Sequence, residues 1–155
     1  MKKMVGALLF VLMTSISFSQ SELKWYTDMN EAAKVAQKDN KPMMLFFTGS
    51  DWCGWCHKLQ REVFSQKAFI DWAKKSIILV EVDFPRAKAQ PQNIKDQNNL
   101  LQRQFGVQGY PTCWFVKAEN TSDGKINLSQ LGSSGYRAGG PENWIKEVSA
   151  FLPAK

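Results

Sequence analysis

Two cysteines separated by two residues, Cys53 and Cys56, form the part of this sequence best suited to chemistry. They follow an apolar run at 42–47 and precede a helix-like stretch at 57–64. Cysteines with this spacing at the start of a helix can close a small disulfide ring. The free N–H groups and partial positive charge of the helix N-terminus favour a thiolate on the first cysteine, whose pKa falls from ~8.5 to about 3.5–7.5 in such motifs. The pattern predicts a pair that exchanges disulfides with other proteins.

The same cysteines allow two interpretations that involve a bound group. Cys53–His57 also fits C-x-x-C-H, the attachment signature of c-type haem. A zinc site would need four ligands, and only His57 and Cys113 remain to complete one. Small c-type cytochromes are mostly helical, whereas this motif lies between a predicted buried strand and a strand that follows a proline. We therefore expect no haem, no metal and no other cofactor.

The N-terminal residues 1–19 have the pattern of a secretory signal. Lys2 and Lys3 precede an apolar stretch at 5–16, which is shorter than the roughly 20 residues of a membrane span. Small residues around Ser19 predict cleavage after it, and an uncleaved anchor is the alternative. The predicted mature chain, 20–155, has the size of one domain, and we expect it to be periplasmic or secreted, with no membrane span.

Charge and cysteine usage narrow the class of protein. The formal net charge is +6 at pH 7, and the charged residues are interspersed rather than gathered with aromatics into a basic stripe, so nucleic acid is not an expected partner. All three cysteines lie in the predicted mature part, and exported proteins meet an oxidising compartment. One close pair plus the odd Cys113 predicts a redox pair rather than a framework of structural disulfides.

Hydrophobic periodicity and breaker residues predict alternating strands and helices. The expected strands are 23–27, 43–47, 77–82, 112–117 and 126–131. The expected helices are one capped by Asp28, one over Cys53–Val63, one capped by Ser65, one over Asn93–Phe105 with Ile94, Leu100, Leu101 and Phe105 on its apolar side, and one opened by Pro141. We also expect a tight turn at Asp123-Gly124 and a flexible segment at Gly132–Gly140. Strand–helix–strand units imply parallel pairing, and the late hairpin adds an antiparallel edge, which defines an α/β fold.

The motifs and their order resemble those of the thioredoxin family. Ser50–Cys56, at the end of a predicted buried strand, is similar to the W-C-x-x-C of thioredoxins, and Phe105–Thr112 is similar to their F/Y-G-V-x-x-x-P-T. Within the family, Phe47–Trp52 and Glu62–Ser65 resemble exported bacterial thioredoxin-like domains, including the C-terminal domain of the thiol:disulfide interchange protein DsbD. The resemblance implies a thioredoxin fold, a central mixed sheet flanked by helices, in a single domain.

The resemblance also implies roles for particular residues. Cys53 would be the exposed nucleophile and Cys56 the buried resolving cysteine. Pro111 would be a cis-proline facing the pair, the backbone of Tyr110 an edge for a substrate chain, and Trp52 an apolar platform beside the nucleophile. The implied activity is thiol–disulfide exchange with protein substrates, as a monomeric reductase served by an upstream redox partner. The alternative is a thioredoxin-like chaperone or adaptor that binds clients without redox turnover.

The sequence departs from the family pattern in two places. Phe46 and Phe47 stand where thioredoxin has a buried aspartate, and Trp55 stands where it has a proline, so the redox potential is not expected to follow that of thioredoxin. We expect His57 to be a solvated helix residue rather than one that tunes the thiolate. We expect Cys113 to be an inert core residue rather than a third redox cysteine.

Overall fold

One mixed sheet organises the protein. The computed structural model describes residues 23–122 and 125–153, and within these residues the strands follow the order β1-β3-β2-β4-β5. The strands are β1 (Trp25–Tyr26), β2 (Met43–Thr48), β3 (Ile78–Asp83), β4 (Thr112–Asn120) and β5 (Ile126–Ser134). β3 pairs in parallel with both β1 and β2, whereas β4 runs antiparallel to β2 and β5 antiparallel to β4. The predicted parallel core with an antiparallel edge is confirmed.

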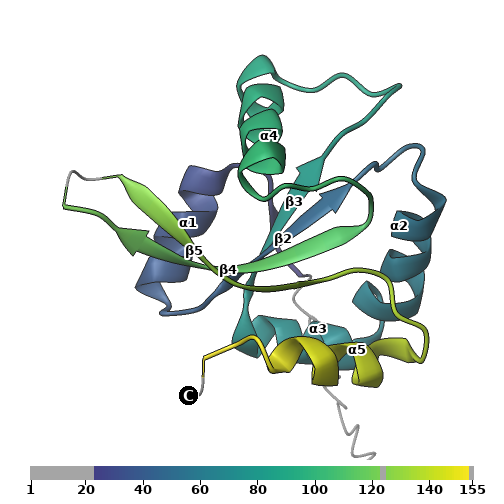
Figure 1. Ribbon diagram of the computed structural model, residues 1–155. Helices are drawn as coiled ribbons and strands as arrows, with labels where there is room; N and C mark the ends of the chain where they lie inside the picture. The colour runs from purple at the N-terminus through teal and green to yellow at the C-terminus, as the bar shows by residue number, and fades with distance from the viewer. Residues whose placement is uncertain (1–22, 123–124, 154–155) are drawn as a thin grey trace, which may run out of the picture.

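Helices cover both faces of the sheet. They are α1 (Met29–Lys38), α2 (Gly54–Leu59), the π-helix η1 (Gln60–Phe64) that continues α2, α3 (Lys67–Ser76), α4 (Gln92–Gln104) and α5 (Gly140–Ser149). Apolar residues of α1 and α4 pack on one face, and those of α2, η1, α3 and α5 pack on the other. Figure 1 shows α2, α3 and α5 gathered on one side, with α1 and α4 apart from them. This is the arrangement of the thioredoxin fold, as the sequence predicted.

The central strand β2 is buried along its whole length. Its side chains alternate: Leu45 and Phe47 pack with the helices α1 and α4, and Met44 and Phe46 pack with the opposite layer. Fully burying one such side chain contributes about 1.5–3 kcal/mol, so the burial of β2 strongly stabilises the position of this strand. On the α5 side the layer is completed by Trp144, which is fully buried and donates its indole N–H to the Gly135 carbonyl at 3.0 Å.

Local signals succeeded at one helix start and failed at another. Asp28 caps α1 as predicted, because its carboxylate accepts the N–H groups of Asn30 and Glu31 at 2.7 and 3.2 Å. The prediction that Ser65 caps a helix is wrong. Its N–H still donates to the carbonyl of Gln60, since η1 is wound one residue wider than an α-helix, and its hydroxyl donates back to Arg61. Gln66 takes the cap position of α3, but its side chain caps no N–H of that helix and instead donates to the Arg61 carbonyl at 2.8 Å.

Three other expectations need correction. Leu100 is 58% exposed rather than part of the apolar side of α4, and the helix instead buries Asn98, whose amide donates to the Asp83 carbonyl at 2.9 Å. The segment Gly132–Gly140 is not flexible throughout, because β5 extends to Ser134 and pairs there with β4. The helix expected over 53–63 begins at Gly54 and becomes η1 at Gln60. The Asp123-Gly124 turn lies outside the described residues.

A carboxylic acid faces the helix layer from inside the sheet. Glu81 of β3 lies opposite Phe46 of β2, and both line a cavity of about 360 Å³ that also contacts Trp25 and Phe64. Burial raises the pKa of Glu81 above its ordinary value of 4.5; the nearby charge of Asp83 raises it further, and that of Lys88 lowers it. The folded protein therefore binds this proton more tightly than the unfolded chain does.

Glu81 therefore makes a contribution to the free energy of unfolding that decreases as the pH rises. Below about pH 4.5 Glu81 is protonated in both states, and its favourable contribution is lost as the pH passes through the raised folded-state pKa. Glu81→Gln imitates the protonated acid, so we expect it to raise the thermal midpoint at about pH 7 and to change it little at about pH 4. Calorimetry of both forms at the two pH values tests this, and an equal shift at both would contradict it.

Candidate active site

The cysteine pair lies where β2 leaves the sheet and helix α2 begins. The Cys53 N–H donates to the Gly49 carbonyl at 2.9 Å, which closes the turn after β2. Cys53 is the N-cap of α2, and its sulfur accepts the N–H of Cys56 at 3.2 Å. The two are joined by a disulfide, and 5% of Cys53 is accessible compared with none of Cys56. Both cysteines are therefore largely covered, and Cys53, expected to be exposed, keeps the only accessible surface of the pair.

Two aspartates join the turn that carries Cys53 to β3 and to the loop after β3. The Asp83 carboxylate accepts both the N–H and the hydroxyl of Ser50, at 2.7 and 2.6 Å. Asp51 reaches in the opposite direction, and its carboxylate accepts the backbone N–H groups of residues 86–88 at 2.7–3.2 Å. These N–H groups hold the pKa of Asp51 below its usual range. The turn and the loop therefore fix each other.

Trp52 is fastened to the same loop. Its indole N–H donates to the Phe84 carbonyl at 2.8 Å, and the guanidinium of Arg86 lies 3.9 Å from its ring centre. A side chain at Gly49 would place its Cβ 2.3 Å from the indole, so glycine is required at this close approach. The ring also meets the edge of Tyr110, with 5.7 Å between ring centres. Trp52 is thus a fixed wall beside Cys53.

The structure confirms the cis peptide bond between Tyr110 and Pro111. The Tyr110 side chain packs against Phe84 and Trp52, and its hydroxyl accepts the side-chain amide of Gln102 at 2.7 Å. Burial raises the pKa of Tyr110. The side chain of Tyr110 is therefore held by contacts with Trp52, Phe84 and Gln102.

Trp55, the residue that precedes Cys56, forms a further aromatic contact that the sequence analysis did not predict. Trp55 is 58% exposed and packs against Tyr136 of the segment that follows β5, with 5.3 Å between ring centres. Lys58 lies over both rings, its Nζ 5.0 and 4.8 Å from their centres, and the Tyr136 hydroxyl donates to Glu62 at 2.7 Å. The sequence analysis named Trp55 only as a departure from the family motif, and nothing in the sequence indicated Tyr136 as its neighbour.

The remaining candidates, His57 and Cys113, differ in their exposure to solvent. His57 is exposed and its Nε2 lies 2.8 Å from the Ser50 carbonyl oxygen, so the tautomer protonated at Nε2 donates to the turn. Cys113 is fully buried in the same apolar cluster as the pair, and burial raises its pKa, which favours the thiol. Among the described residues, no group of three or more His, Cys, Asp and Glu side chains is placed to hold a metal ion.

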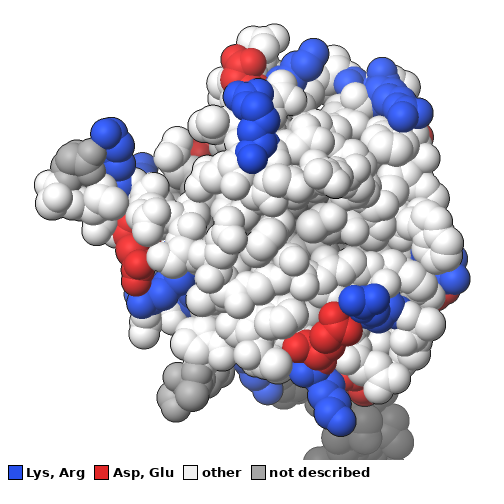
Figure 2. Space-filling model, viewed as in Figure 1, with Lys and Arg blue, Asp and Glu red and all other residues white. Residues whose placement is uncertain are grey.

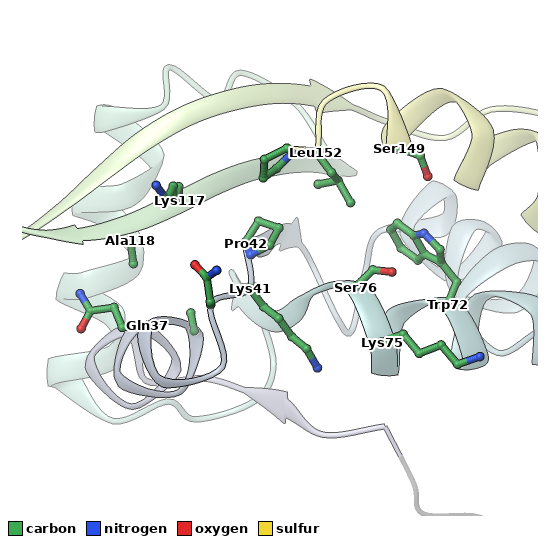
Figure 3. Close-up of a pocket in the computed structure, with 13 residues that line it drawn as sticks. Gln37, Lys41, Pro42, Trp72, Lys75, Ser76, Lys117, Ala118, Ser149 and Leu152 are labelled. Carbon is green, nitrogen blue, oxygen red and sulfur yellow. The ribbon is translucent and has the colours of Figure 1, made fainter. Parts of the chain in front are cut away.

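A separate groove lies far from the cysteines. It has a volume of about 730 Å³ and opens near Lys41 and Pro42, which precede β2, whereas Cys53 follows the other end of this strand. Figure 3 shows the residues that line it, drawn from α1, α3, β4 and the end of the chain after α5. A six-residue strand spans about 20 Å. The groove therefore contributes nothing to the cysteine site.

Comparison with known proteins agrees with the fold and the motif. Residues 29–127 match the family model of a thioredoxin-like domain. The disulfide bond reductase DsbH of Chlamydia pneumoniae is 36% identical over 132 residues, which cover 85% of this chain and 74% of that protein. A solved structure of a DsbH oxidoreductase superposes with a TM-score of 0.74 at 33% identity, covering 91% of this chain and 92% of the other.

The C-terminal domain of DsbD, which the sequence resembles, is also among the similar solved structures. The oxidised C-terminal domain of DsbD from Neisseria meningitidis has a TM-score of 0.51 at 16% identity, covering 81% of this chain and 97% of that one, which shows a shared fold. With a buried strand, a Cys-x-x-Cys disulfide at a helix start and a cis-proline in place, the chain belongs to the thioredoxin-like family. It is a thiol–disulfide oxidoreductase.

The contacts of Asp51 make a prediction for the loop after β3. Asp51→Asn removes the charge that three backbone N–H groups share, so we expect faster amide hydrogen exchange at Arg86, Ala87 and Lys88. Asp71→Asn is the matched control, because Asp71 is another surface aspartate with a lowered pKa but pairs with Lys67 on α3. Exchange followed by NMR tests this. Unchanged rates at residues 86–88 would show that the carboxylate does not hold the loop.

Proposed function

We propose that the protein reduces disulfides of exported proteins, with Cys53 as the nucleophile and Cys56 as the resolving cysteine. The observation that carries the assignment is the asymmetry of the pair. Cys53 keeps 5% of its surface accessible and its sulfur accepts the N–H of Cys56, whereas Cys56 is fully buried. A sulfur that accepts an N–H at a helix start is stabilised as a thiolate, and a buried one is not. The reductive direction is supported by the name of the relative, disulfide bond reductase DsbH.

The proposed reaction transfers two electrons without a cofactor. The Cys53 thiolate attacks one sulfur of a client disulfide, forming a mixed disulfide and releasing the other client sulfur as a thiolate that takes up a proton. Cys56 loses its proton and attacks the Cys53 sulfur, which releases the second client thiol and closes the Cys53–Cys56 disulfide. An upstream dithiol partner must then supply two electrons to restore the reduced pair. In this proposal the protein acts as a monomer.

Client binding is assigned to the walls around the pair. Trp52 would lie beside the client sulfur as an apolar platform, and the backbone of Tyr110, next to Pro111, would align the client chain. Fixed positions favour these roles, because Trp52 is tied to Phe84 and Arg86 and the Tyr110 ring supports it from below. A site whose walls are held before binding spends less of the binding free energy on ordering them.

The two cysteines are expected to fail in different ways when they are replaced. Cys53→Ser should abolish reduction, because no nucleophile remains at the surface. Cys56→Ser should accumulate mixed disulfides with clients, because the second step is blocked. Insulin reduction and non-reducing gels of trapped adducts test this. Cys113→Ser is the matched control and should reduce insulin like the wild type without accumulating adducts, because it keeps both Cys53 and Cys56 and replaces a buried cysteine.

Each alternative has its own outcome in that experiment. Adducts on Cys53→Ser in place of Cys56→Ser would reverse the two roles. A wild-type protein that binds unfolded insulin but never reduces it would be a chaperone or adaptor rather than a reductase. Covalently attached haem in protein from a host competent in cytochrome c maturation would contradict a cofactor-free reaction.

We also propose that residues 1–19 direct export and are removed, giving a periplasmic or secreted protein. The charged start and the apolar stretch at 5–16 support this. No helix of the described residues is long and apolar enough to cross a membrane.

We expect mature protein from the periplasm of a bacterial host to begin at Gln20, as read by intact mass. Leu9→Arg, which interrupts the apolar stretch, should leave full-length precursor in the cytoplasm. Export of that variant, or a retained N-terminus in the wild type, would contradict the proposal.

A further inference from the structure

Each cysteine of the pair is preceded by a tryptophan whose ring packs against a cationic side chain. Arg86 lies 3.9 Å from the ring centre of Trp52, which precedes Cys53. Lys58 lies 5.0 Å from the ring centre of Trp55, which precedes Cys56. The two cations come from different parts of the chain, Arg86 from the loop after β3 and Lys58 from α2 itself. The residue before each cysteine therefore combines an aromatic face with a cation.

Both cations are held in place by contacts other than charge pairing. The N–H of Arg86 is bound by Asp51, which fixes the backbone beneath the guanidinium. Lys58 is half-buried between Trp55 and Tyr136. Ordering a long side chain costs rotamer entropy, and here the packing has already met this cost in the free protein. A carboxylate arriving at either place would meet a cation already in position.

The local carboxylates are engaged elsewhere. Among the described residues, neither Lys58 nor Arg86 forms an ion pair with an acidic side chain. Asp51 is shared by three backbone N–H groups, and Glu62 is bound by the Tyr136 hydroxyl and paired with Arg61 at 3.9 Å. Among the described residues, the two cations beside the cysteines therefore have no carboxylate ion-pair partner that an arriving client would have to displace.

The wider surface has the same sign. Lys88 lies two residues after Arg86 and its side chain is exposed. Figure 2 shows Lys and Arg side chains gathered over the loop that joins β3 to α4, at the upper right of the view, while the middle of this face, between α4 and α5, has no charged side chains. Charge of one sign at the edge of an uncharged surface steers oppositely charged partners toward it.

We propose that the pairs Arg86–Trp52 and Lys58–Trp55 select protein clients whose disulfide cysteines are flanked by aspartate or glutamate. This selectivity rests on the proposed function, since it concerns which disulfides reach Cys53. The carboxylate of such a client lies beside a cation, and the aliphatic part of the client chain lies on the tryptophan face. The same cations attract the thiolate form of Cys53, so their effect on clients has to be separated from their effect on the nucleophile.

Two matched disulfide peptides make that separation. One carries glutamate next to each cysteine, the other carries glutamine at the same positions. The reduced wild-type protein is mixed with each peptide, and the second-order rate constant is followed by tryptophan fluorescence. The ratio of the two rate constants, acidic over neutral, measures selectivity, because a change in the Cys53 thiolate alters both rates alike. We compare this ratio between the wild type and the double variant Lys58→Gln/Arg86→Gln.

The expected result is a loss of selectivity in that variant only. At an ionic strength of about 0.01 M we expect its ratio to be roughly tenfold below that of the wild type, in the range of electrostatic steering, and at about 1 M the difference should vanish. Lys34→Gln/Lys38→Gln removes the same charge from α1, which covers the opposite face of the sheet, and should keep the wild-type ratio.

Three outcomes would overturn the inference, and a fourth would overturn the proposed function on which it rests. An equal ratio in the wild type and in Lys58→Gln/Arg86→Gln would show that these cations select nothing. An equal fall in Lys34→Gln/Lys38→Gln would assign the effect to net charge rather than to this site. A peptide with lysine beside each cysteine that reacts as fast as the acidic one would leave only an apolar platform. Failure of the wild type to reduce any of the peptides would instead refute the proposed function.

Discussion

The burial of β2 is the constraint on which the active site depends. All six residues of the strand are enclosed between two helix layers, so its end at Thr48 has a fixed position and direction. The turn that follows is tied to the neighbouring strand by Asp83 and to the loop after that strand by Asp51. A reactive group is placed accurately when a rigid element carries it and its neighbours lock it, and Cys53 meets both conditions.

The apolar floor beneath the pair explains how two neighbouring cysteines can have unequal reactivity. Phe46 of β2 packs against Trp25 and Phe64, with ring centres 5.9 and 5.1 Å away. All three cysteines belong to the same apolar cluster, in which Cys56 and Cys113 are fully buried and Cys53 keeps 5% of its surface accessible. A thiolate there would lose its hydration without gaining a partner charge, which favours the thiol. Only Cys53 combines access to solvent with a hydrogen-bond donor for its sulfur. In the proposed reaction, this difference distinguishes the nucleophile from the resolving cysteine without a carboxylate in β2.

The sequence predicted what depends on short-range pattern and missed what depends on contacts between distant residues. Strands of unbroken apolar residues and the Asp28 cap were found, because their signals lie within a few residues. Ser65 looked like a helix cap, but whether it could act as one was decided by the wide turn of η1 before it. Leu100 fitted the apolar period of α4, yet the helix turns Asn98 inward to reach the Asp83 carbonyl. No local pattern reports such a choice.

The same division runs through the active site itself. The cysteines and the cis-proline were recognisable because they form motifs, whereas Arg86 and Tyr136 reach the pair from loops with no motif of their own. The motif residues fix the reaction, since they set the position of the sulfur and the backbone edge beside it. The loop residues surround that chemistry without carrying it. Substitution in these loops can therefore change which disulfides approach Cys53, while the fold that positions the sulfur stays the same.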